Sequence, residues 1–181
     1  METILDHNQK ITIKRSGSKQ VVRIQEKDGV YWLTYPGLEA EKEFLHGFST
    51  RLGGVSKEHL YSMNLSFARN DDPAAVMENY RRFTAIMYCT PDDVVASHQT
   101  HTTNVRRVSS ADKGKGVTKE KDYSDIDGLI TDESGVLLAC FFADCVPLYF
   151  VDSVHHAIGL VHSGWRGTVD RMGQVTLNAM S

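Results

Sequence analysis

The stretch 128–167, GLITDESGVLLACFFADCVPLYFVDSVHHAIGLVHSGWRG, is the most apolar part of this 181-residue chain. Four mostly apolar runs in it are separated by turn residues: 128–131, 136–143, 147–151 and 157–162. Short runs of this kind are typical of strands that are buried on both faces of a sheet. We therefore expect successive buried strands here, followed by a helix over residues 169–180.

Shorter elements are expected immediately before this stretch. Asp71-Asp72-Pro73 offers a helix N-cap and a first-turn proline, which predicts a helix over about 74–88. Strands are expected at 94–97 and 104–108, on either side of a segment with two histidines. Residues 109–125 are polar and rich in Gly and Lys. They predict a surface loop outside the core, and its mobility is left open.

The N-terminal part of the chain has the pattern of short strands. Strands are expected at 10–15, 21–24 and 30–34. Asp28-Gly29 is a strong signal for a tight hairpin turn between the last two of these strands. Further on, the paired glycines of Arg51-Leu-Gly-Gly-Val-Ser56 indicate a tightly folded backbone.

Composition excludes several classes of protein. Hydrophobic residues make up 41% and charged residues 24%, which is ordinary for a soluble globular domain. The net charge of −3 provides no basic surface for nucleic acid or for a membrane. The longest apolar stretch, 135–150, is too short to span a bilayer, and the N-terminus shows no secretory signal. Three cysteines then indicate reduced thiols and a cytoplasmic location.

Three segments place a metal ligand or nucleophile at the end of an apolar run: Ser97-His-Gln-Thr-His101, Ala143-Asp-Cys-Val-Pro147 and Val161-His-Ser-Gly-Trp-Arg-Gly167. His101, Cys145 and His162 from these segments form the candidate metal set. Two histidines and one cysteine would leave one position of a tetrahedral zinc ion open for water or substrate, as in catalytic sites. Bound zinc would make hydroxide available near neutral pH.

Residue types and spacing also allow simpler interpretations. His101 and Cys145 are 44 residues apart, and Cys145 and His162 are 17 apart, so sequence cannot show that they meet. Free cysteine is among the most buried residue types, and Cys145 also fits a core thiol. His162 also fits a core histidine. His98 and His101 would point to opposite faces of a strand, so only one of them should reach the site.

Other polar residues have two interpretations each. Arg51, in its glycine-bearing turn, suits phosphate or carboxylate binding but also a plain surface turn. Arg166 has the same two interpretations. Asn64, in Met63-Asn-Leu-Ser66, would bond a substrate or cap a turn. Asp127-Gly128 is interpreted as a turn before a strand.

Six segments, in this order, resemble one known family: Leu45-His-Gly-Phe-Ser-Thr-Arg-Leu-Gly-Gly-Val-Ser56, Met63-Asn-Leu-Ser66, Gln99-Thr-His101, Asp127-Gly-Leu-Ile-Thr131, Ala143-Asp-Cys-Val-Pro147 and Gly159-Leu-Val-His-Ser-Gly-Trp-Arg-Gly167. The sequence resembles the bacterial laccase-domain family, formerly called polyphenol oxidases and also known as purine nucleoside phosphorylases of the YfiH and YlmD type. Each motif alone is weak, but six in order are specific. The resemblance changes the expected role of Cys145 from core thiol to metal ligand.

The resemblance implies a role for each matching residue. His101, Cys145 and His162 fall on the family's zinc ligands, with Ser163 where the family usually has Ala. Arg51 and Asn64 fall on its substrate or phosphate contacts, and Arg166 lies in its Gly-Trp-Arg-Gly motif. The implied ion is zinc, with copper as the alternative.

The resemblance also implies a fold and an activity. The expected fold is mixed α/β: layered mixed β-sheets covered by helices in a single domain. A strand-rich lead-in at 1–36 would precede the domain at 37–181, whose C-terminal part we expect to be missing from this sequence. The implied activity is phosphorolysis of adenosine, inosine, guanosine and methylthioadenosine, with adenosine deamination in addition. The expected partners are purine nucleosides and phosphate, in a monomer or homodimer.

Three rival functions remain at this point. A copper polyphenol oxidase is one, although eight histidines without a His-Xaa-His pair do not suit a multicopper cluster. A cysteine hydrolase would use Cys145 as nucleophile and His162 as base. A purely structural metal site is the third, and three ligands instead of four speak against it.

Overall fold

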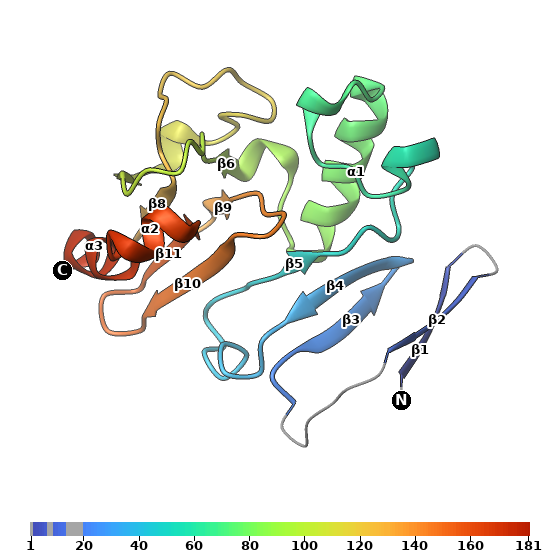
Figure 1. Ribbon diagram of the computed structural model, residues 1–181, viewed down its shortest axis with the longest axis horizontal. Coiled ribbons are helices and arrows are strands. Elements are labelled where there is room, and N and C mark those ends of the chain that lie inside the picture. Colours follow the sequence, from blue (N-terminus) through green and yellow to red (C-terminus); the bar gives the residue numbers. More distant parts are fainter. Residues whose placement is uncertain (1, 7–8, 14–19) are drawn as a thin grey trace. The chain divides into compact units, whose positions relative to one another are not determined.

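The computed structural model describes residues 2–6, 9–13 and 20–181, which form two compact units, 1–88 and 89–181 (Figure 1). The described part of the chain contains several small sheets and few helices, so the expected mixed α/β class is confirmed. No helix among the described residues is long and apolar enough to cross a membrane.

The first unit is built from antiparallel strands and one long helix. β1 (Glu2–Asp6) pairs with β2 (Gln9–Ile13), while β3 (Arg23–Lys27), β4 (Val30–Thr34) and β5 (Phe48–Ser49) form a three-stranded sheet in that order. The expected strand at 10–15 corresponds to β2, although residues 14 and 15 lie outside the described residues.

The hairpin predicted at Asp28-Gly29 is confirmed. Lys27 pairs with Val30, and both turn residues have positive φ, 54° at Asp28 and 78° at Gly29. Such backbone angles match the twist of the flanking strands, and Gly adopts them without steric cost.

The predicted helix is α1 (Pro73–Ile86). The Asp72 side chain accepts a hydrogen bond from the Ala74 N–H, as expected of an N-cap, and Pro73 occupies the first turn. Val76 and Tyr80 are buried on one face of the helix, which explains its amphipathic pattern. Two single 3-10 turns, η1 (Glu58–Leu60) and η2 (Phe67–Arg69), precede it.

The second unit contains two sheets. β10 (Val146–Asp152), β11 (Ala157–Ser163), β8 (Gly128–Thr131) and β7 (Val105–Arg107) form a four-stranded sheet in that order. Only the β7–β8 pair is parallel in it. A second, two-stranded sheet pairs β6 (Val94–Ala96) with β9 (Leu137–Ala139) in parallel.

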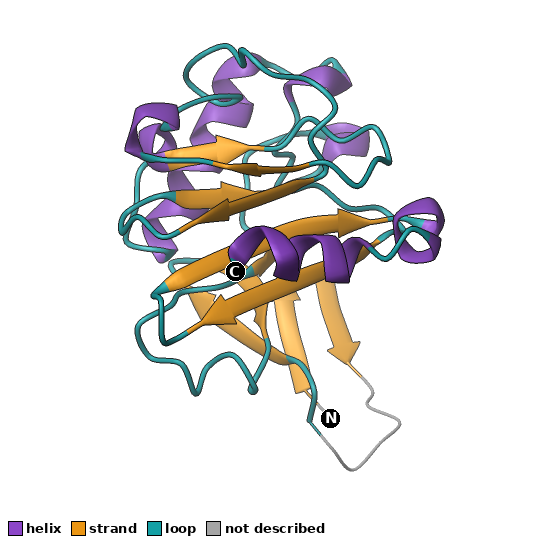
Figure 2. Cartoon of the chain, turned by 90° about the vertical axis from the view of Figure 1, so that its left-hand side faces the viewer, coloured by secondary structure: helices purple, strands orange, loops and turns teal. Residues whose placement is uncertain are grey.

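The two sheets of this unit share a hydrophobic core, as expected for layered sheets. Val95 of β6 and Leu138 of β9 cluster with Leu129 of β8, and Ile158 and Leu160 of β11 pack against them. Helix α3 (Met172–Met180) contacts β11, β8 and β7 and lies across the four-stranded sheet (Figure 2). The prediction of layered sheets covered by helices is thus confirmed within this unit.

Two expected elements differ clearly from those observed. The run 136–143 forms a strand only over β9, because its later residues leave the sheet toward β10. The expected helix at 169–180 corresponds to α3, which begins three residues later, and a separate short helix, α2 (Trp165–Val169), precedes it. Arg171 separates them in the left-handed conformation, with φ of 59°, which interrupts helical hydrogen bonding.

The polar loop 109–125 is fastened to β6. The Ala96 N–H donates to the Lys115 carbonyl, and the Gly114 N–H donates to the Val94 carbonyl. The Tyr123 hydroxyl donates to the Ala96 carbonyl, and its ring packs against the core. The expectation that this segment contributes nothing to the core was therefore wrong for Tyr123. The remaining 3-10 turns are η3 (Pro91–Asp93) and η4 (Ser110–Asp112).

Candidate metal centre

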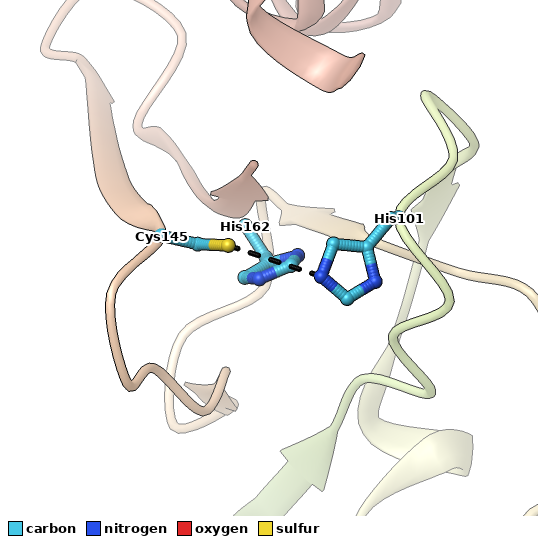
Figure 3. A group of neighbouring side chains, drawn as sticks. All are labelled: His101, Cys145 and His162. Carbon is cyan, nitrogen blue, oxygen red and sulfur yellow. Dashed lines mark hydrogen bonds between the residues drawn. The ribbon is translucent and has the colours of Figure 1, made fainter. Parts of the chain in front are cut away.

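The second unit brings His101, Cys145 and His162 together (Figure 3). One ligand atom from each lies within 4.8 Å of the others. The Cys145 Sγ is 3.8 Å from the His101 Nε2, and the two imidazole rings meet edge to face with centroids 4.9 Å apart. A tetrahedral zinc ion, with bonds of about 2.0–2.3 Å, places its ligand atoms roughly 3.5 Å apart. The three residues therefore fit such an ion.

The β10–β11 hairpin aligns two of these residues. Val146 pairs with Ser163, so Cys145, which precedes β10, lies beside Gly164, which follows β11. A Cβ atom on Gly164 would come within 3.1 Å of the Cys145 Sγ and 3.0 Å of the His101 Cδ2. Glycine at this position therefore leaves the space that the side chains of the two candidate ligands occupy.

His98 does not join the cluster, as expected. Its Nδ1 accepts a hydrogen bond from the Asp125 N–H, and its backbone pairs with Ile126. His101 instead has a φ of 65°, an uncommon angle for a residue with a side chain. Such conformations persist where the surroundings hold them, and they often mark functional sites.

Asp127 is the residue that holds His101 in this conformation. It is fully buried, and its carboxylate accepts hydrogen bonds from the backbone N–H groups of Thr100 (3.1 Å), His101 (3.0 Å) and Thr102 (2.8 Å). The Thr102 hydroxyl also donates to it, at 2.9 Å. One side chain thus fixes three consecutive residues around His101.

The same carboxylate orients His162. The His162 Nδ1 lies 2.8 Å from the Asp127 Oδ1, so Nδ1 carries the proton and the Nε2 lone pair stays available for an ion. Burial alone would raise the pKa of Asp127, but the hydrogen bonds from Thr102, Thr100 and His162 lower it below its usual value. The interpretation of Asp127-Gly128 as only a turn before β8 was therefore wrong.

Two features of the surroundings of Cys145 disfavour ionisation of its thiol. Desolvation, and then the neighbouring Asp144 carboxylate, raise the pKa of Cys145 above its ordinary value. A bound zinc ion would reverse this, since a coordinating thiol is deprotonated. The two nitrogen donors and one sulfur donor suit zinc, and they also suit copper.

Arg51 belongs to the first unit and lies in the expected tight turn. Its Nε and one terminal nitrogen donate to the Tyr61 carbonyl at 2.9 and 2.6 Å, and the side chain is exposed. A Cβ atom on Gly54 would lie 2.0 Å from the Ser62 carbonyl oxygen, which explains why glycine is needed there.

Asn64, also in the first unit, has an extensive internal network. Its amide nitrogen donates to the Asp71 carboxylate (2.8 Å) and to the Ser66 carbonyl (3.1 Å). Its oxygen accepts from the Ser66 N–H, at 3.0 Å. These contacts match the turn-capping alternative, and its substrate contact stays a proposal.

Arg166 lies on α2 in the second unit, two residues after Gly164. It is exposed, and its guanidinium stacks over the equally exposed ring of Trp165, 5.3 Å from the ring centroid.

The fold and the cluster define a mixed α/β protein with a candidate His₂Cys metal centre. The family model described as "Multi-copper polyphenol oxidoreductase laccase" matches residues 45–181. The chain belongs to this family, which confirms the resemblance seen in its motifs.

Several relatives carry phosphorylase names. The chain is 40% identical over 135 residues to "Purine nucleoside phosphorylase YlmD" of Bacillus subtilis, covering 74% of this chain and 48% of that protein. It is 31% identical over 176 residues to "Purine nucleoside phosphorylase LACC1" of Mus musculus, covering 90% and 39%. The chain thus spans about half or less of the length of these relatives.

Solved structures share the fold. The crystal structure of YlmD from Geobacillus stearothermophilus superimposes with a TM-score of 0.72 at 36% identity, covering 83% of this chain and 54% of that one. That of YfiH from Bacillus licheniformis gives 0.70 at 30% identity, covering 80% and 53%. These matches extend over both compact units and agree with the expected single domain.

Proposed function

We propose that this chain is a purine nucleoside phosphorylase with a zinc centre formed by His101, Cys145 and His162. The observation that carries the proposal is the convergence of these three ligand atoms within 4.8 Å, on a fold whose relatives carry phosphorylase names. The substrates would be adenosine, inosine, guanosine and methylthioadenosine. The reaction breaks the bond between the purine nitrogen and C1′ of the ribose and joins C1′ to a phosphate oxygen.

Different residues of the chain would bind the metal, bind the substrates and transfer the proton. His101, Cys145 and His162 would hold the ion, while Asp127 would orient the His162 imidazole and hold the backbone at His101. Arg51, Asn64 and Arg166 would contact the phosphate or the nucleoside, since a guanidinium fork matches phosphate oxygens. Zinc, when bound, supplies Lewis acidity and a water of lowered pKa. The exposed Asp144, next to Cys145, is our candidate for proton transfer to the departing purine.

The same centre would also support adenosine deamination, which needs an activated water at C6 of adenine. Adenosine therefore separates the two reactions. With phosphate present we expect adenine as a product, and without phosphate we expect slow formation of inosine only. Chromatography of both reactions checks this. Adenine release at the same rate with and without phosphate would contradict phosphorolysis.

The identity of the bound metal and the reaction catalysed distinguish this proposal from a copper oxidase. Protein purified without added copper should contain about one zinc per chain by elemental analysis. It should cleave nucleosides without oxidising phenols. Copper-dependent phenol oxidation with no nucleoside turnover would instead assign the oxidase function.

Arg51→Met is expected to raise the KM for phosphate roughly 10–100-fold with a smaller change in kcat, because hydrogen bonds to a charged ligand are lost. Initial rates at varied phosphate measure this, and thermal melting checks the turn at the Tyr61 carbonyl. Arg69→Met, at another exposed arginine of the same unit, is the matched control. An unchanged KM for phosphate would remove Arg51 from the phosphate site.

A further inference from the structure

The parallel pair of β6 and β9 stops just before the chain reaches two of the candidate ligands. Its last backbone hydrogen bond runs from the Ser97 N–H to the Ala139 carbonyl, at 2.9 Å. The Ser97 carbonyl then accepts from the Lys121 ammonium and not from the neighbouring segment. Beyond Ser97, the residues that follow β9 are hydrogen-bonded by a side chain instead of by backbone groups.

Gln99 provides this pairing. Its Nε2 donates to the Phe141 carbonyl at 2.6 Å, and its Oε1 accepts from the Phe141 N–H at 2.7 Å. The buried Ser97 hydroxyl also donates to Oε1, at 2.8 Å, which fixes which end of the amide faces which partner. The Gln99 amide thus bonds both backbone groups of Phe141, as a neighbouring strand would. The two residues are 42 positions apart in the sequence.

The contact between Gln99 and Phe141 joins the segment that carries His101 to the segment that carries Cys145. Gln99 precedes His101 by two residues, and Phe141 precedes Cys145 by four. The Asp127 carboxylate accepts hydrogen bonds from the His101 N–H and the His162 imidazole, whereas Gln99 makes the contact to the segment that leads to Cys145. Gln99 is only half-buried and Phe141 is 40% exposed, so water can reach this contact once it opens.

We infer that Gln99 is a positioning residue that holds the Cys145 segment against the His101 segment, so that thiol and imidazole lie at metal-binding distance. The inference rests on the proposed metal centre. It assigns Gln99 no contact with substrate or with the reacting atoms. Without the amide, the segment between β9 and β10 would sample positions in which the Cys145 Sγ is farther from the His101 Nε2 than the observed 3.8 Å.

Gln99→Met tests this inference, since it nearly keeps the side-chain volume and removes both hydrogen bonds to Phe141, together with the one from Ser97. We expect the zinc affinity, measured by competition with a chromogenic chelator, to fall about 10–100-fold, as for other groups that orient ligands. In metal-free protein, Cys145 should react faster with iodoacetamide, as followed by peptide mass spectrometry. The melting temperature of the metal-free protein should stay close to that of the unaltered chain.

Gln174→Met is the matched control, because the Gln174 amide bonds Asn178 on the exposed face of α3, away from the ligand segments. Unchanged zinc affinity and unchanged Cys145 reactivity in Gln99→Met would overturn the inference. If the unaltered chain binds no zinc, the proposed function fails, and the alkylation rates alone still decide whether Gln99 restrains Cys145. A large fall in melting temperature with unchanged Cys145 reactivity would show a purely structural role and would also overturn it.

Discussion

Cys145→Ser is expected to lower kcat/KM for inosine phosphorolysis by at least about 100-fold and to remove most of the bound zinc. A direct ligand should matter more than groups that only orient ligands, whose loss typically costs 10–100-fold. The serine hydroxyl is nearly isosteric but does not ionise as a zinc ligand near neutral pH. Steady-state rates and elemental analysis of the same preparation measure the effect. Cys89→Ser, at a thiol outside the cluster, should leave both unchanged.

The same experiment separates the metal centre from a cysteine hydrolase. The hydrogen bond between Asp127 and His162 would also orient a catalytic base beside Cys145, so this rival has a structural basis. His101 has no required role in that mechanism. If the centre is a zinc site, His101→Ala should lower activity as strongly as Cys145→Ser, and zinc should protect Cys145 from alkylation. Near-normal activity in His101→Ala, with stoichiometric labelling of Cys145, would favour the hydrolase.

Asp127→Asn is expected to have the second-largest effect. An amide nitrogen in place of Oδ2 would face the N–H groups of Thr100 and Thr102, and in place of Oδ1 it would face His101 and His162. The second arrangement also favours the tautomer of His162 that carries its proton on Nε2, where the ion should bind.

We expect zinc affinity to fall about 10–100-fold and the free energy of unfolding to fall by about 1–3 kcal/mol, the cost of an unsatisfied buried donor. Chelator competition and urea unfolding of the metal-free protein measure the two quantities. Asp125→Asn is the matched control, since this exposed carboxylate lies two residues away and accepts hydrogen bonds from the Thr100 and Ser124 hydroxyls. An Asp127→Asn protein with unaltered zinc affinity would exclude the orienting role.

The three candidate ligands were accessible from sequence because each stands at the end of an apolar run, in a motif with a fixed neighbourhood. Their convergence was not accessible. It depends on the antiparallel register of β10 and β11, and on a left-handed backbone at His101. Neither feature can be predicted from the sequence separations of 44 and 17 residues between the ligands.

Asp127 and Gln99 show why the supporting residues were missed. An Asp-Gly pair before an apolar strand is an ordinary turn signal, and the role of Asp127 depends on N–H groups 25 to 27 positions earlier in the chain. Gln99 was visible only as part of a motif, and its partner lies 42 positions away. Long-range hydrogen bonds of this kind have no local pattern. In contrast, the hairpin at Asp28-Gly29 and the N-cap at Asp72 were predicted correctly, because their causes are local.

The phosphate dependence of hypoxanthine release from inosine tests the central claim most directly. The zinc-loaded chain should release hypoxanthine at a rate that saturates with phosphate, and one ribose phosphate should form for each hypoxanthine. Both should disappear together when a chelator removes the zinc and return when zinc is restored. Zinc-loaded protein that releases no hypoxanthine at any phosphate concentration would contradict the account.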